Sequence, residues 1–332
     1  MIQRLFIFVI SNKLYPYYCW IVLMAASYLT GSLNFPGASA TDEQMRPFAG
    51  AIAMPTIIAY LWYALISIHD TAVDSFNQLA ENIPEEQQKI KKKRFLQTAI
   101  RNTAISIVLS LLATFSYLYS EDLLAFDGNI VSITMNLMAV PFWFFIFFFI
   151  VHTVSLNNIA TQEYLTKDSI DIMGIEKLAP VSKFVVNNTV KAAIIFVLIP
   201  LFWIGRQIPR IDIILTCLLL LGITFYLFMP VFKAQRIIAH KKAMAIQRIY
   251  KKLNDTMEEN ICGGRRITDN PRTLRRIACL IATKTEIAKV REWPVDVPQS
   301  LKVIAVTAAA PLSMVAYSLV DYALSQFNLF GL

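Results

Sequence analysis

Long stretches without a charged side chain constrain this chain more than any other feature of its sequence. Six of them approach the roughly 20 apolar residues that a helix needs to cross about 30 Å of hydrocarbon. They lie near 17–34, 49–68, 102–120, 130–151, 213–232 and 303–320. Only 16% of all residues are charged, whereas a soluble domain carries about 25%. The sequence therefore predicts an all-α fold, a polytopic membrane helix bundle.

A seventh apolar stretch, 189–205, contains one charged residue, Lys191. A lysine near the end of a membrane helix can extend its ammonium group to the interface, so we expect about seven transmembrane helices. Residues 1–16 contain too short an apolar run for a signal peptide, and no small-residue cleavage site follows it. We expect them to form an uncleaved amphipathic helix at the membrane surface, with Arg4 and Lys13 among the head groups.

The basic residues predict the orientation of the chain. With the N-terminus inside, the cytoplasmic segments hold 28 of the 31 Lys and Arg residues, and only Arg46, Arg206 and Arg210 lie outside. This excess in cytoplasmic loops is the rule for inner-membrane proteins. We therefore expect a bacterial inner-membrane protein with a cytoplasmic N-terminus and an external C-terminus. The same asymmetry explains the net charge of +8, so no direct contact with nucleic acid is expected.

Three parts follow one another along the chain. Residues 1–232 are predicted to form the membrane bundle, with cytoplasmic loops over 69–101 and 152–188. Residues 233–298 are predicted to form a cytoplasmic helical hairpin, because two helical patterns are separated there by strong helix breakers. Residues 299–332 are predicted to form the final transmembrane helix and an external C-terminus.

The predicted hairpin has clear ends. Its first helix ends at Gly263 and Gly264, since glycine closes helices, and its second begins after Asn270, with Pro271 in its first turn. The apolar stripes comprise Ala239, Ala243, Ile246, Tyr250, Leu253 and Met257 in the first helix, and Leu274, Ile277, Ile281 and Ala288 in the second. The hairpin either only stabilises the fold or serves oligomerisation or sensing.

A cluster of arginines lies near the predicted tip of this hairpin. Membrane orientation alone does not explain basic residues so far from the bilayer, so they are candidates for a surface that contacts a partner. The cluster comprises Arg265, Arg266, Arg272, Arg275 and Arg276.

Motifs of catalysis are absent from the sequence: there is no P-loop, GxSxG, HExxH or CxxC. The three histidines, His69, His152 and His240, lie at the inner ends of spans. That position is more typical of residues that mark the membrane boundary than of a proton or zinc sensor. We therefore expect no enzymatic activity, no cofactor and no metal site.

The final span carries the candidates for pore lining or helix packing. Ala305, Ala309, Ser313 and Ala316 share one face, and small residues let membrane helices approach closely. Tyr317 and Asp321 lie on the neighbouring, more polar face, and a carboxylate at a pore mouth would attract cations. The alternative is that Asp321 lies at the interface, outside the hydrocarbon. By contrast, we expect the aromatic stretch 141–151 to face lipid.

The segment Glu292–Trp293–Pro294–Val295–Asp296 precedes the final span. It resembles an E-W-P-x-D motif of uncharacterised multipass bacterial inner-membrane proteins. In architecture alone, the chain also resembles membrane effector subunits of bacterial anti-phage systems, including those encoded beside retrons. The second resemblance implies a protein that disrupts the membrane when a cytoplasmic partner releases it.

These observations predict a regulated channel or membrane-permeabilising effector of the inner membrane, controlled through its hairpin and, as the resemblance implies, acting in antiviral defence. The expected partners are the lipid bilayer, further copies of the chain in a homo-oligomer, and a cytoplasmic regulatory protein or ribonucleoprotein. One alternative is a secondary transporter, which would need polar groups at the bilayer midplane. The other is a non-catalytic membrane scaffold subunit.

Overall fold

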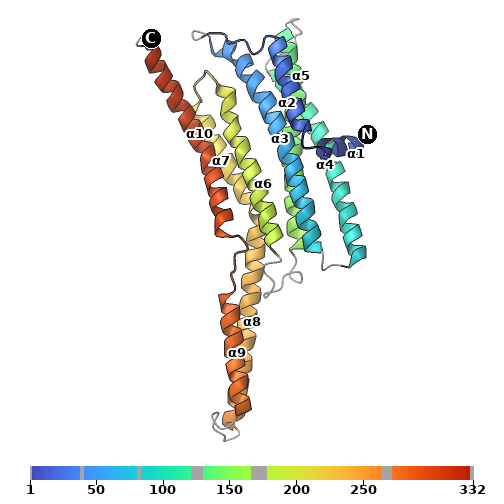
Figure 1. The fold of residues 1–332 in the computed structure, drawn as a ribbon, viewed down its shortest axis with the longest axis vertical. Helices are drawn as coiled ribbons and strands as arrows, with labels where there is room; N and C mark the ends of the chain where they lie inside the picture. Colours follow the sequence, from blue (N-terminus) through green and yellow to red (C-terminus); the bar gives the residue numbers. More distant parts are fainter. Residues whose placement is uncertain are drawn as a thin grey trace.

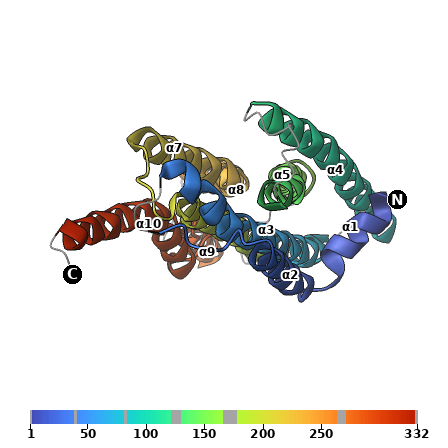
Figure 2. The same ribbon diagram turned by 90° about the horizontal axis from the view of Figure 1, so that it is seen from above.

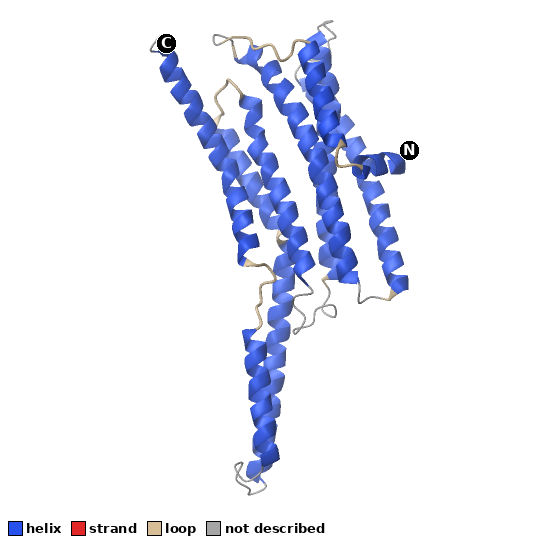
Figure 3. Cartoon of the chain, in the orientation of Figure 1, coloured by secondary structure: helices blue, strands red, loops and turns tan. Residues whose placement is uncertain are grey.

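The computed structural model describes residues 2–37, 41–80, 84–120, 130–165, 178–262 and 271–329. Within these ranges the chain is helical and contains no strand (Figure 3). The α-helices are α1 (Ile2–Ser11), α2 (Tyr15–Leu29), α3 (Asp42–Ala80), α4 (Glu85–Ser120), α5 (Ile130–Ile159), α6 (Ala179–Leu198), α7 (Arg210–Leu227), α8 (Met229–Cys262), α9 (Pro271–Lys289) and α10 (Val297–Leu329). A π-helical turn, η1 (Ala160–Tyr164), follows α5, and a 3-10 turn, η3 (Ile199–Trp203), follows α6. The predicted all-α class is confirmed.

Five segments are long and apolar enough to cross a membrane, and they run within α3, α4, α5 with η1, α6 with η3, and α10. Two bent helix pairs, α1 with α2 at 95° and α7 with α8 at 42°, bring the number among the described residues to as many as seven if each pair counts as one span. The chain is therefore a multi-pass membrane protein. The helix of the first span ends at Leu29, earlier than expected, because Gly31 adopts a positive φ of 77° and closes it.

The bundle is built around α3. Figure 1 shows α2 to α7 and α10 side by side, with α8 and α9 projecting from one end, which we call the hairpin end; the C-terminus lies at the opposite, far end. α3 packs against α2, α5 and α6, and the view from above shows it between them (Figure 2). Its inner face is almost fully buried, with Ile58, Leu61 and Leu65 no more than 1% exposed.

The aromatic stretch of α5 lies in the interior of the bundle. Phe145 and Phe148 are buried, and the Phe145 ring stacks on Trp62 with the centroids 5.2 Å apart. The expectation that residues 141–151 face lipid is therefore wrong. The rings instead fill the space between α5 and its neighbours through stacked and edge-to-face contacts. Aliphatic side chains such as Leu218 and Leu221 of α7 are exposed instead, as expected of a surface that faces lipid.

α1 lies across the side of the bundle rather than along it (Figure 1). Its residues Phe6 and Val9 are buried, and Trp62 Nε1 donates a hydrogen bond to the Val9 carbonyl at 2.6 Å. Leu5, Ile7 and Phe8 remain exposed. A helix that anchors one apolar face in protein and exposes apolar residues beside it suits the predicted position at a membrane surface.

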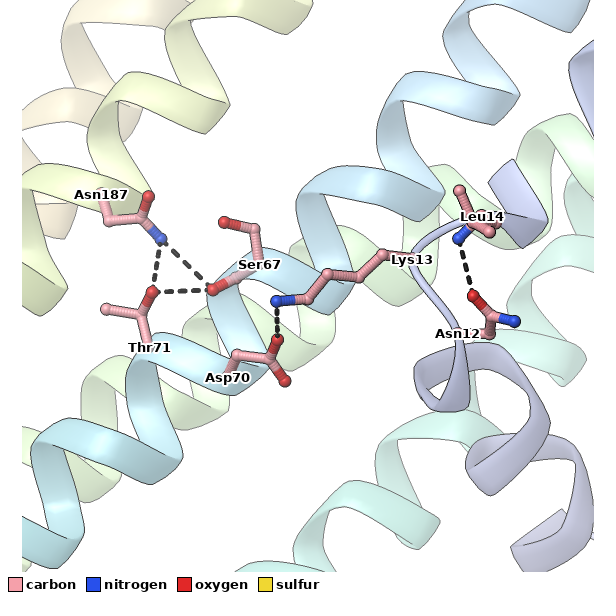
Figure 4. A network of polar contacts seen from close by, with 7 residues as sticks. All are labelled: Asn12, Lys13, Leu14, Ser67, Asp70, Thr71 and Asn187. Atoms are coloured by element: carbon pink, nitrogen blue, oxygen red, sulfur yellow. Dashed lines mark hydrogen bonds and ion pairs between the residues drawn. The ribbon is translucent and has the colours of Figure 1, made fainter. Parts of the chain in front are cut away.

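A network of polar contacts holds the turn between α1 and α2 against α3 (Figure 4). Lys13 Nζ lies 3.0 Å from Asp70 Oδ2 of α3. From α6, Asn187 Nδ2 donates to Thr71 Oγ1 of α3 at 3.1 Å. Two helices, α3 and α6, and a turn are thus joined by polar groups, which is typical of the boundary between hydrocarbon and water.

The length of α3 agrees with this placement. Arg46 lies near the far end of α3, and Ser67 belongs to the polar network. At about 1.5 Å per residue, the intervening helix rises about 30 Å, which is the thickness of the hydrocarbon core. The remainder of α3, down to Ala80, extends beyond that thickness toward the hairpin end.

Candidate functional site: the joint between the hairpin and the final helix

Residues 290–296, which we call the connector, join α9 to α10 and contain the motif Glu292–Trp293–Pro294–Val295–Asp296. The connector is not helical, since proline disfavours helix at the residue before it. Figure 1 shows it where the hairpin meets the bundle. Four of the five motif residues contact another part of the fold, and the Asp296 carbonyl accepts hydrogen bonds at the start of α10, so the connector is anchored rather than loose.

The first anchor is an ion pair between the connector and α8. Lys242 Nζ lies 3.2 Å from Glu292 Oε1 and also donates to the Val290 carbonyl at 3.0 Å. The Lys242 side chain is only 15% exposed. A pair of this kind is screened less by water than a surface pair, and removing one partner leaves the other charge poorly solvated.

The second anchor joins the connector to the bundle. The Trp293 ring meets Phe232 of α8 edge-on at 6.0 Å, and Val295 packs against the apolar core. Ser182 Oγ of α6 donates a hydrogen bond to the Pro294 carbonyl. Because Ser182 is 1% exposed, losing this bond would leave a buried hydroxyl without a partner, at a cost of about 1–3 kcal/mol.

The last motif residue begins α10. The Asp296 carbonyl accepts hydrogen bonds from the Ser300 backbone N–H at 3.0 Å and from Ser300 Oγ at 3.3 Å. Its carboxylate lies 3.8 Å from Arg291 Nη1, but both side chains are largely exposed, so this ion pair adds little stability. The motif therefore links α8, α6 and the start of α10 within five consecutive residues.

α10 then packs along the bundle through a face that differs from the predicted one. Val303, Ala310 and Met314 are buried, with Ala310 in one apolar cluster with α6 and α7 residues and Val303 in another with α6 residues. Of the predicted small-residue stripe, Ala309 and Ser313 are half-buried, whereas Ala305 and Ala316 are exposed. α10 therefore packs against its own chain mainly through a face next to the predicted small-residue stripe. The side chains of Tyr317 and Asp321 lie outside the described residues.

The predicted arginine cluster is described only in part. Arg272, Arg275 and Arg276 are exposed on α9, and their spacing of three and four places them on one face of that helix. Arg265 and Arg266 lie outside the described residues.

The hairpin helices pair through the expected stripes only in part: Ile246, Leu253 and Met257 of α8 and Ile277 of α9 are half-buried. On α9, Ile287 is buried, whereas Leu274 and Ile281 are 42% and 49% exposed. On α8, Tyr250 is 46% exposed, and Lys284 Nζ of α9 lies 4.4 Å above its ring. The aliphatic stem of a lysine can cover apolar surface, so Lys284 replaces an apolar residue in this contact. One side of the hairpin is left with exposed apolar side chains.

Two of the three histidines meet inside the bundle. His69 Nδ1 of α3 lies 3.4 Å from His152 Nε2 of α5, and both rings are buried against Phe6. His240 is exposed on α8. Among the described residues, no group of three or more His, Cys, Asp or Glu side chains could hold a metal ion. The pair forms a polar contact between α3 and α5.

Analysis of the sequence alone missed the partners of the connector: Lys242, Phe232 and Ser182. For Lys242 a signal was present, because Val231, Ala234 and Ile238 are spaced three and four apart on α8 and place Lys242 on the same face. A lysine on a buried face needs a partner of opposite charge. Ser182 carries no such signal.

Comparison with known proteins reveals no relative: no family model, no curated protein and no solved structure matches the chain. Any function must therefore be argued from the geometry of the joint, the bundle and the hairpin.

Proposed function

We propose that the chain is a regulated channel or membrane-permeabilising effector of the inner membrane, controlled through its hairpin. The observation that supports this most is the anchored connector, which ties the hairpin both to α6 and to the start of α10. Through it, a force on α8 and α9 is transmitted to the final membrane helix. Such a link is needed if a cytoplasmic event is to control permeation.

The hairpin is long and is continuous with the bundle through α8. α8 runs without interruption from the bundle core, where Val231 and Ala234 are 0% exposed, to Cys262. Its 34 residues extend about 50 Å at about 1.5 Å per residue. Arg272, Arg275 and Arg276 on α9, together with the exposed Leu274 and Ile281, offer basic and apolar surface to a protein or ribonucleoprotein partner.

The permeation path itself is proposed to form between copies of the chain. Exposed small residues such as Ala305 and Ala316 of α10 are suited to close packing against a second copy, because their side chains let helix backbones approach in lipid. The placement of basic residues, 28 of 31 on one side, favours a cytoplasmic hairpin and an external end of α10. Asp321 would then lie near the outer mouth and favour cations.

The test is inducible expression in bacteria with simultaneous recording of membrane potential and growth. Lys242→Gln loosens the connector and frees α10 from the hairpin, so cells should depolarise at lower expression than with the unaltered chain. Arg248→Gln, an exposed position on the same helix, removes the same charge and should behave like the unaltered chain. In the same assay, Asp321→Asn should reduce cation flux.

Two results would contradict parts of this proposal. If none of these proteins changes the membrane potential at any expression level, the secondary transporter and scaffold alternatives are favoured over permeabilisation. If the unaltered chain depolarises cells and Lys242→Gln acts identically, the chain permeabilises the membrane but the connector does not control it.

A further inference from the structure

The far end of the bundle contains a cavity that neither the joint nor the hairpin uses. Its volume is about 680 Å³, within the range typical of small-molecule sites. It lies between the first turns of α3 and α5, the end of α4 and the turn η3, and it is open on one side. Elements far apart in the sequence therefore build one site.

Two arginines from different elements line this cavity. Arg46 belongs to the start of α3, and Arg206 follows η3. They are the charged residues among the described lining side chains. The cavity therefore presents two guanidinium groups, whose charges membrane helices screen less than water would.

A hydrogen bond holds the Arg206 guanidinium group in place, but one of its nitrogen donors has no hydrogen-bond partner among the described residues. One of its guanidinium nitrogens, Nη2, donates a hydrogen bond to the Phe202 carbonyl at 2.6 Å. Its Nε is buried and has no hydrogen-bond partner among the described residues. A buried charged donor without a partner is costly, and an anion in the cavity would supply the missing acceptor.

The rest of the cavity wall is largely apolar and aromatic. Phe142 of α5 meets the rings of Trp143 and Phe202 edge-on, with centroids 5.7 and 5.6 Å apart. Ser132 and Asn136 add polar groups nearer the start of α5. The site thus combines a cationic, polar part with an aromatic part, which suits a ligand with an anionic group and an apolar body.

Two glycines allow neighbouring segments of the fold to approach each other closely at the cavity. A Cβ on Gly50 of α3 would lie 2.4 Å from Met135 Cε of α5, so a side chain there would push Met135 out of its place in the cavity wall. Gly205, with φ +73°, precedes Arg206, and a Cβ on it would lie 2.0 Å from Met45 Cε. The backbone that positions Arg206 therefore depends on glycine.

The depth of the cavity matches a lipid. Its lining on α5 extends from Val131 to Trp143, a rise of about 18 Å along the helix, compared with about 15 Å for half of the hydrocarbon core. Arg46 lies in the first turns of α3 at the far end, whereas Phe142 and Trp143 lie about three turns into α5.

We propose that this cavity binds an anionic phosphate group through Arg46 and Arg206. Guanidinium groups bind phosphate oxygens through paired, charge-assisted hydrogen bonds. The phosphate belongs either to a phospholipid, whose acyl chains lie against the aromatic wall, or to a small soluble phosphate ester. This site is independent of the proposed permeation function.

Native mass spectrometry of the purified full-length protein in detergent tests the proposal, with phosphatidylglycerol as the anionic probe and phosphatidylcholine as the zwitterionic comparison. Phosphatidylglycerol should bind, and Arg206→Gln and Arg46→Gln should each weaken it about tenfold, the effect of one lost charge-assisted contact. Arg101→Gln, which removes the same charge from an exposed position near the middle of α4 that does not line the cavity, should leave binding unchanged.

A competition arm separates the two sources of phosphate. Failure of millimolar glycerol phosphate to displace phosphatidylglycerol assigns the site to lipid, whereas displacement that both arginine variants weaken assigns it to a soluble ester. Arg46 is exposed, so Arg46→Gln keeps the test valid if Arg206→Gln fails to fold. Unchanged phosphatidylglycerol binding in a folded Arg46→Gln variant, or equal binding of phosphatidylcholine, would overturn the proposal.

Discussion

At the scale of single residues, two glycines show how differently the same residue type acts. Gly205 forms the turn after η3 and has a φ of +73°. A Cβ added to it would lie 2.0 Å from Met45 Cε, so any side chain there would clash with Met45. Gly222 lies inside α7, and nothing lies within 4 Å of a Cβ built on it. Only the first is required by the fold.

We predict that Gly205→Ala lowers the thermal stability of the purified protein, since the left-handed conformation costs a residue with a side chain about 1–2 kcal/mol and Met45 must also move. Gly222→Ala should not lower it, because alanine favours helix over glycine by about 1 kcal/mol. Melting curves in detergent measure both. Equal melting temperatures for the two variants would show that the turn at Gly205 tolerates a side chain.

At the scale of elements, α10 presents two faces with different roles. Ala310 is 1% exposed against the cluster formed with Ala193 and Phe196 of α6 and Leu220 of α7. Ala316, two turns of helix nearer the C-terminus, is exposed. The first face holds α10 to its own bundle, and the second is available to lipid or to another copy of the chain.

We predict that Ala310→Leu destabilises the protein by about 1–3 kcal/mol, because the added atoms overfill a closely packed contact. Ala316→Leu should leave the melting temperature of the monomer unchanged but reduce the oligomer fraction, if copies pack through the small-residue stripe. Thermal melting and size-exclusion chromatography with light scattering separate these effects. An unchanged oligomer with Ala316→Leu would assign that face to lipid.

At the scale of the whole molecule, the projecting hairpin makes orientation decisive. A hairpin of this length can meet a cytoplasmic partner only if it lies on the inner side of the membrane, as the distribution of basic residues predicts. Cys279 of α9 is exposed and is a natural reporter, whereas Cys19 and Cys217 are half-buried in the bundle.

We predict that Cys279 is protected in intact cells. In a variant with Cys19→Ala, Cys217→Ala and Cys262→Ala, a membrane-impermeant maleimide should label the protein only after the cells are permeabilised. Adding Cys279→Ala removes the last thiol and controls for background. Rapid labelling of intact cells would place the hairpin outside and reverse the topology.

The sequence by itself determined the properties that depend on neighbouring residues. Hydropathy over about 20 residues is a local quantity, so it identified the spans and the all-α class. Helix breakers act locally too, and the expectations from Gly263, Gly264 and Pro271 agree with α8, whose bounds are Met229–Cys262, and with α9, which begins at Pro271.

Only the tertiary structure decided which faces meet. The aromatic rings of α5 turned inward, and most of the expected stripe of α9 remained exposed, because an all-apolar or two-sided helix has no pattern that distinguishes a protein contact from lipid. The contacts of Lys242 with Glu292 and of His69 with His152, and the meeting of Arg46 and Arg206 at one cavity, join positions far apart in the chain. Such contacts follow from how helices pack in three dimensions, and no local pattern in the sequence contains that information.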